Sequence, residues 1–145
     1  MNLWQTLAIS QSGMNVEQLR AETAARNLAN SHVAQAPGSP PVKPLRVLAK
    51  PGPAPGFAAM VGHADGGRPV TGVSGVVYEA EATPRRVLDP GHPYADAKGY
   101  VSYPGINGLD EMFSLTLAVR AYEANVTAFN AARSMALKAL DIGGR

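Results

Sequence analysis

The 145-residue sequence contains no cysteine, which excludes a disulfide framework, a thiolate nucleophile and a metal site with cysteine ligands. Its formal net charge is only +2, so it lacks the strong basic character that tight binding to nucleic acid requires. Its apolar runs are much shorter than the roughly 20 residues of a membrane span. The first residues have neither a basic region nor a continuous apolar run, so we expect no cleaved secretory signal.

Proline is missing from both ends of the chain and abundant between them. All 12 prolines lie between Pro37 and Pro104, and residues 109–142 contain neither proline nor glycine. Because proline removes a helical hydrogen bond and clashes with the preceding turn, helices are expected only at the two ends. The sequence therefore predicts a mainly α fold, with long N- and C-terminal helices forming an antiparallel coiled-coil pair. We divide the chain into an N-terminal helix segment at 1–32, a Pro/Gly-rich middle domain with short strands at 33–106, and a C-terminal helix segment at 107–145.

The C-terminal segment has the clearest helical pattern. Asn107 is a suitable N-cap, and Asp110 and Glu111 in the first turn complement the helix dipole. Large apolar residues recur in alternating steps of three and four, as in a coiled coil; they are Met112, Leu115, Val119, Tyr122, Val126 and Phe129. The same steps continue through Arg133, which interrupts the pattern, and Ala136 to Leu140. A second stripe consists of small residues, namely Ala118, Ala121, Ala124, Ala128, Ala131, Ala132 and Ala139. We expect the large residues to grip the N-terminal helix and the alanines to contact neighbouring subunits.

The N-terminal segment has a weaker heptad pattern over residues 3–30, which Ser10 and Glu17 interrupt. A helix with so few large apolar side chains is marginal alone, so it needs the C-terminal helix as its partner. The middle region is expected to hold short strands; the candidates are 42–48, 57–61, 75–82, 85–88 and 100–103. We expect 75–82 and 85–88 to form a hairpin through a turn at Thr83-Pro84.

The stretch at 89–96 is the most enzyme-like part of the sequence, because two carboxylates and a histidine could bind a metal there. Its closely spaced prolines and glycine, and aspartates that cap turns, favour a rigid structural turn instead. The sequence has no phosphate-binding loop, dinucleotide fingerprint or nucleophile elbow. We therefore expect neither an enzyme nor a cofactor. The alternative is a metal-dependent enzyme that uses Asp89, His92 and Asp96.

Asn27-Leu28-Ala29-Asn30, near the end of the predicted N-terminal helix, resembles the signature shared across the flagellar rod and hook axial protein family, and other blocks are most similar to its proximal rod members. The more specific motifs are Asp89-Pro90-Gly91-His92-Pro93 and Arg120-Ala121-Tyr122-Glu123-Ala124-Asn125-Val126. The chain departs from the family pattern at the Pro-rich stretch 36–44, and at Pro104-Gly105-Ile106-Asn107 where the family has Pro-Asn-Val-Asn.

The resemblance implies a structural subunit of the bacterial flagellar proximal rod, the axial drive shaft that transmits torque and surrounds the export channel. It implies export by the flagellar type III apparatus and a place in the periplasm-spanning rod. The implied partners are copies of the chain, other rod proteins, and ring or adaptor proteins at the rod base, with no nucleic acid and no direct membrane span. The alternative is a secreted coiled-coil adaptor that does not polymerise.

Together, the heptad patterns and the resemblance predict two sets of functional residues. The predicted assembly interface comprises Leu3, Leu7, Met14, Asn27, Leu28, Asn30, Met112, Leu115, Val119, Tyr122, Val126, Phe129, Met135 and Leu140. The predicted middle-domain loop, which would brace subunits against one another, comprises Asp89, Pro90, Gly91, His92, Pro93, Asp96 and Tyr100.

Overall fold

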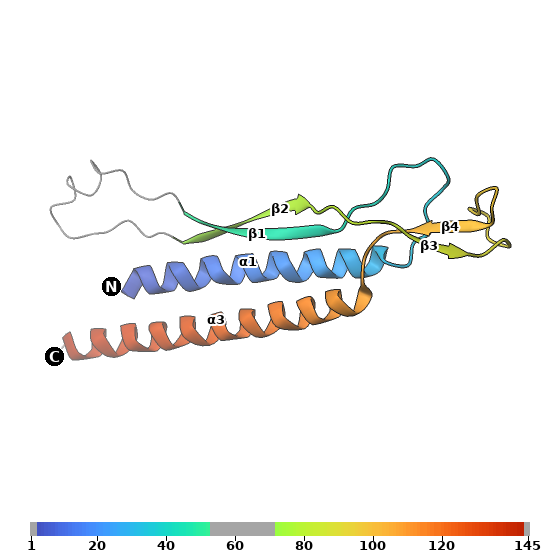
Figure 1. The fold of residues 1–145 in the computed structure, drawn as a ribbon. Helices are drawn as coiled ribbons and strands as arrows, with labels where there is room; N and C mark the ends of the chain where they lie inside the picture. Colours follow the sequence, from blue (N-terminus) through green and yellow to red (C-terminus); the bar gives the residue numbers. More distant parts are fainter. Residues whose placement is uncertain (1–2, 53–71, 144–145) are drawn as a thin grey trace, which may run out of the picture. The chain divides into compact units, whose positions relative to one another are not determined.

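The computed structural model describes residues 3–52 and 72–143. Within these residues, two long helices flank four short strands (Figure 1), in the order α1 (Leu3–Asn30), β1 (Leu45–Pro51), β2 (Val73–Glu79), β3 (Arg85–Leu88), β4 (Tyr100–Tyr103) and α3 (Gly108–Gly143). The prediction of a mainly helical chain with a small β-containing insert is confirmed.

The chain divides into two compact units, and each long helix contributes to both of them. Unit 1 contains Met1–Gln18, Ala49–Val76 and Val119–Arg145, and unit 2 contains Leu19–Leu48 and Val77–Ala118. Within unit 2 the helices run antiparallel, because Asn27 contacts Glu111 while the following residue, Leu28, contacts the earlier Gly108.

The start of α3 confirms the predicted helix cap. The Oδ1 atom of Asn107 accepts a hydrogen bond from the Leu109 N–H at 3.1 Å, and its carbonyl accepts one from the Glu111 N–H at 3.2 Å. The side-chain bond satisfies an N–H group that has no partner inside the first helical turn, and the bond to the carbonyl is the first hydrogen bond of the helix. The cap and the acidic first turn therefore fix where the helix begins.

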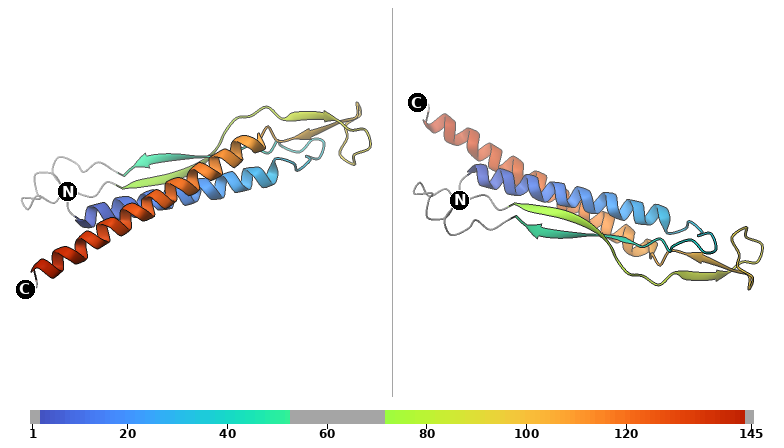
Figure 2. Two further views of the ribbon diagram at one scale, coloured as in Figure 1. Left: turned by 90° about the horizontal axis from the view of Figure 1, so that it is seen from below. Right: turned by 90° about the horizontal axis from the view of Figure 1, so that it is seen from above.

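The strands form two separate two-stranded sheets, one of β1 with β2 and one of β3 with β4. In the first sheet, the N–H of Gly52 donates to the carbonyl of Gly72 at 2.7 Å and the N–H of Ala80 donates to that of Pro44 at 2.8 Å, so the pairing is antiparallel (Figure 2). In the second sheet β3 also runs antiparallel to β4, with Leu88 opposite Tyr100.

The bounds of β3 and β4 match the prediction, but the predicted hairpin between 75–82 and 85–88 is wrong. Residues of β2 pair with β1 and residues of β3 pair with β4. The segment between β2 and β3 does not turn back, because the backbone of Ala80 bonds to Pro44 and the Thr83 carbonyl lies against Gly105. The first strand also begins later than predicted, at Leu45, and the strand expected at 57–61 lies outside the described residues.

Gly105 allows the close approach between the segment before β3 and the segment before α3. A Cβ atom at this position would overlap the carbonyl oxygen of Thr83. Since that oxygen belongs to the backbone, rotating a side chain cannot relieve the overlap. The departure from the Pro-Asn-Val-Asn pattern therefore has a steric basis in this chain.

We expect Gly105→Ala to lower the free energy of unfolding by about 1–3 kcal/mol, the usual cost of overpacking. Urea denaturation of the purified chain would measure this loss. Gly91→Ala is the matched control, because its nearest contact would be Asp89 Oδ1 at 3.8 Å. Its effect should stay within about 0.5 kcal/mol. Equal losses in the two variants would contradict the steric explanation.

Candidate assembly interface

A buried polar cluster joins α1, β1 and α3 within unit 2. The Nδ2 atom of Asn27 donates to the carbonyl of Leu45 at 2.8 Å and to Oε2 of Glu111 at 3.1 Å. Its Oδ1 atom accepts a hydrogen bond from the Leu45 N–H at 2.9 Å. The Asn27 carboxamide therefore bonds to both backbone groups of Leu45, as a neighbouring strand would, and holds α3 at the same time.

Glu111 completes this cluster. Only 1% of Glu111 is exposed, and its second oxygen, Oε1, accepts a hydrogen bond from Nη1 of Arg46 at 2.6 Å. Both oxygens of the buried carboxylate thus have partners, as a charge in a protein interior requires. We call Asn27, Leu45, Arg46 and Glu111 the polar clamp. No local pattern could have paired these residues, because Arg46 and Glu111 lie 65 positions apart.

The most deeply buried residues of α3 are not the large apolar ones of the heptad pattern. Glu111, Ala118 and Ala132 are the buried residues of α3, with 3% of Ala118 and none of Ala132 exposed. Asn125, at the same seven-residue spacing, is half-buried. Of the large apolar residues expected to grip α1, Met112, Val119, Tyr122 and Leu140 are exposed and Leu115, Val126 and Phe129 are half-buried, so that contact stays a prediction. Two residues of the alanine stripe, Ala118 and Ala132, supply buried positions instead.

Small side chains explain this choice of face. Within unit 1, a Cβ atom added to Gly13 of α1 would lie only 2.8 Å from Oδ1 of Asn125. The two helix surfaces thus approach more closely than large side chains would allow. Gly13 is the one glycine among residues 2–31, and sequence analysis did not assign it a role.

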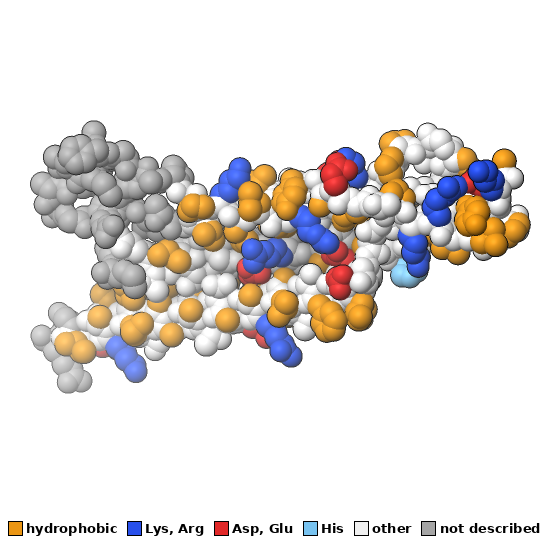
Figure 3. Space-filling model, viewed as in Figure 1, with side chains coloured by type: hydrophobic (Ala, Val, Ile, Leu, Met, Phe, Trp, Pro, Cys, Tyr) orange, Lys and Arg blue, Asp and Glu red, His pale blue; other side chains and the backbone are white. Residues whose placement is uncertain are grey.

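Large apolar residues on α3 remain exposed in the chain. We call four of them the outer ridge, namely Met112, Val119, Tyr122 and Leu140, with exposed fractions between 39% for Tyr122 and 72% for Leu140. Met135 is also exposed, but the helical repeat places it on another side of α3. Apolar side chains are visible along α3 in Figure 3. Monomeric proteins rarely leave such extended apolar surface open to water, so it indicates an interaction site. No helix in the described part of the chain is long and apolar enough to cross a membrane.

The other residues of the predicted interface lie in mixed environments. Asn27 is buried in the polar clamp, and Asn30 is exposed at the end of α1. The half-buried members are Leu3, Leu7, Met14, Leu28, Leu115, Val126 and Phe129. Because these side chains keep some accessible surface, their contact with neighbouring subunits stays a prediction.

The loop between β3 and β4 is organised around Asp96. Its Oδ1 atom accepts hydrogen bonds from the N–H groups of Lys98 at 2.8 Å and Tyr100 at 2.9 Å, and Oδ2 forms an ion pair with Arg86. The hydrogen bond from Tyr100, with smaller contributions from Lys98 and the Arg86 charge, holds the pKa of Asp96 below its ordinary value of 3.8. The Asp96 carboxylate therefore holds the loop backbone in place.

His92 is likewise engaged with the loop backbone. The ring Nδ1 atom of His92 accepts a hydrogen bond from the Tyr94 N–H at 3.0 Å, and the backbone N–H of His92 donates to the carbonyl of Asp89 at 3.3 Å. Within residues 3–52 and 72–143, no group of three or more His, Asp or Glu side chains is placed to hold a metal ion. Asp89, His92 and Asp96 are thus not brought together as a set of three ligands.

The low pKa of Asp96 predicts a pH dependence of this loop. Since its folded-state pKa lies below the unfolded value, the carboxylate stabilises the loop above that value and loses this effect as the pH falls through the folded pKa. We expect the amide NMR signals of Lys98 and Tyr100 to shift with a midpoint below 3.8. Asp96→Asn should abolish this step and Asp89→Asn should preserve it. A midpoint at or above the ordinary value in the unmodified chain would contradict the assignment.

Comparison with known proteins relates these features to one family. A family model described as "Flagellar basal body rod FlgEFG protein C-terminal" matches residues 97–142, which include β4 and nearly all of α3. The flagellar basal-body rod protein FlgC of Escherichia coli O6:H1 is 36% identical over 143 residues, and that of Salmonella typhimurium is 34% identical over 143 residues, with 99% of each chain covered in both cases. FlgC of Bacillus subtilis is 31% identical over 153 residues, again with 99% of each chain covered. The chain therefore belongs to the FlgC family of flagellar basal-body rod proteins.

Proposed function

We propose that this chain, a structural subunit of the flagellar basal-body rod, enters the proximal rod by packing its outer ridge against neighbouring axial subunits. The observation that carries this proposal is the exposure of the large apolar side chains of the outer ridge, between 39% for Tyr122 and 72% for Leu140. Burying such a row between subunits would release water from apolar surface, at about 25 cal/mol per Å². Repeated contacts of this kind suit a shaft that transmits torque.

The separate roles of the helices and the middle domain are consistent with this proposal. The helix segments at 1–32 and 107–145 would form the axial core around the export channel, and the middle domain at 33–106 would brace adjacent subunits. The small inner face of α3 is used within the chain, which leaves the large residues for neighbours. We propose no catalytic activity, because the polar groups of the 89–96 loop bind the backbone of their own loop.

The other proposed properties follow from assembly in the rod. The chain would be exported by the flagellar type III apparatus without a cleaved signal and would lie in the part of the rod that spans the periplasm. Its partners would be copies of itself, other rod proteins, and ring or adaptor proteins at the base.

Purified basal bodies provide the direct test. In a bacterium whose own gene for this subunit is deleted, we expect expression of the chain to restore rods and swimming. The chain should then remain with the rod after detergent extraction of the membrane. A chain that restores motility but is absent from purified basal bodies would instead be the secreted adaptor. Failure of rods to form while the chain is exported normally would also argue against the proposal.

A further inference from the structure

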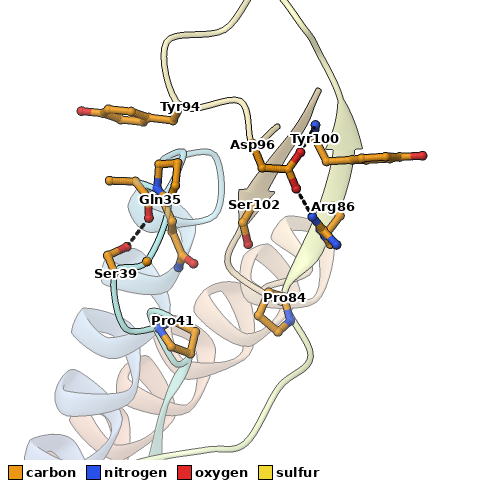
Figure 4. Close-up of a pocket in the computed structure, with 12 residues that line it drawn as sticks. Gln35, Ser39, Pro41, Pro84, Arg86, Tyr94, Asp96, Tyr100 and Ser102 are labelled. Carbon is orange, nitrogen blue, oxygen red and sulfur yellow. Dashed lines mark hydrogen bonds and ion pairs between the residues drawn. The ribbon is translucent and has the colours of Figure 1, made fainter. Parts of the chain in front are cut away.

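A pocket of about 370 Å³ lies in unit 2 between the segment that follows α1 and the β3–β4 sheet (Figure 4). Its walls come from residues 35–41, from Pro84 and Arg86, and from the loop and strand between Tyr94 and Ser102. The volume is within the range of about 300–1,000 Å³ that is typical of ligand sites. None of the functions described above uses this pocket.

One polar group in the pocket lacks a partner. The backbone N–H of Gln35 donates to the carbonyl of Ser102 at 2.9 Å, which fixes the residue beside β4. Only 8% of Gln35 is exposed, and within the described residues its Nε2 atom is buried without a hydrogen bond. In Figure 4 the carboxamide points into the space near Pro41, Pro84 and Ser102. Buried amide groups are almost always hydrogen-bonded, so this donor indicates a missing acceptor.

The remaining walls indicate which kind of acceptor fits. Arg86 and Asp96 form an ion pair with each other, so the charged groups of the pocket compensate one another. Three prolines, Pro37, Pro41 and Pro84, are among the other residues that line the pocket, and Tyr94 and Tyr100 border it. In Figure 4 the Tyr100 ring points away from the space that Gln35 faces. An uncharged acceptor flanked by apolar groups suits such a surface. The backbone carbonyl of an extended peptide has this chemistry, and main-chain hydrogen bonds are a common way of binding such peptides.

We propose that the pocket receives an extended, uncharged peptide segment of a neighbouring rod subunit, whose backbone carbonyl accepts the hydrogen bond from Nε2 of Gln35. This inference rests on the proposed function, because the assembled rod supplies the segment. It explains why the donor has no partner within the described chain: the acceptor arrives only on assembly. The pocket would thus join subunits at their middle domains, independently of the outer ridge.

Gln35→Met gives a test in which stability and assembly move in opposite directions. Methionine has a similar length but no polar group, so it removes a buried donor that the free chain leaves unsatisfied. We expect the melting temperature of the purified chain to stay the same or rise. Rods per cell should fall about 2- to 10-fold, because a neutral hydrogen bond to the neighbour is lost. Tyr94→Ala, which shortens an exposed part of the wall, should also reduce rods without lowering the melting temperature.

Photo-crosslinking identifies the occupant. A benzoyl-phenylalanine in place of Tyr94 should capture an extended segment of an adjacent axial subunit in purified basal bodies, with the crosslinked peptide located by mass spectrometry. A crosslink within one chain, or to a protein outside the rod, would overturn the proposal. A lower melting temperature for Gln35→Met would also overturn it, because the amide would then be satisfied in the free chain. Normal rods with Gln35→Met would refute the pocket alone, whereas absence of the unmodified chain from basal bodies would refute the proposed function.

Discussion

Asn27→Asp should unfold much of unit 2 and abolish swimming, although the substitution changes only one amide to a carboxylate. The new oxygen would replace Nδ2, which donates to the Leu45 carbonyl and to the buried Glu111 carboxylate. Two attractive contacts would become repulsive, and a second charge would be buried beside Glu111. A buried charge left without a compensating partner costs about 3–5 kcal/mol. That is a large part of the roughly 5–15 kcal/mol by which a domain is stable.

Urea denaturation of the purified chain would measure this loss, and soft-agar swimming would report its consequence. Protonating the introduced carboxyl restores a donor, so stability relative to the unmodified chain should partly recover as the pH falls toward about 4. Asn30→Asp is the matched control, because Asn30 belongs to the same motif but is exposed. Its effect should be within about 0.5 kcal/mol. Equal losses in the two variants would refute the role of the polar clamp.

The ends of the fold could be predicted from the sequence because local patterns determine them. Proline cannot continue a helix, so its distribution located both helices, and the side chain of Asn107 marked where α3 begins. The bounds of the strands at 85–88 and 100–103 agree with the prediction. Their partners could not be predicted, because strand pairing depends on contacts between distant segments, such as that of Ala80 with Pro44.

The buried residues of α3 could not be predicted for a different physical reason. A heptad pattern ranks positions by the size and hydrophobicity of their side chains, and on this criterion Met112 and Val119 exceed Glu111 and Ala118. The structure places the latter two inside, one position earlier in the sequence. Close helix approach selects small side chains, and Glu111 is buried because Asn27 and Arg46 satisfy its charge. Neither property can be recognised from the hydrophobic period of one helix.

Because Ala118 is buried and Val119 is exposed, an aspartate should have different effects at these two adjacent positions. Val119 is 44% exposed in the chain, so the carboxylate of Val119→Asp can stay hydrated and the isolated chain should fold normally. In the proposed rod this carboxylate would be buried against a neighbour, at a cost of several kcal/mol for each subunit. Rods should therefore not form, and cells should not swim, although the chain is exported in normal amounts.

Ala118→Asp should instead destabilise the isolated chain, before assembly takes place. Only 3% of Ala118 is exposed, so the carboxylate would be buried within the chain itself, and the purified protein should lose stability before assembly is tested. Thr127→Asp places the same charge at an exposed position of α3 outside the outer ridge and should leave swimming nearly unchanged. Denaturation of each purified variant, with swimming and secreted protein assayed in parallel, separates the three cases. If Val119→Asp swims normally while Thr127→Asp does not, the outer ridge is not the assembly surface, and the side of α3 that carries Thr127 faces the neighbouring subunit.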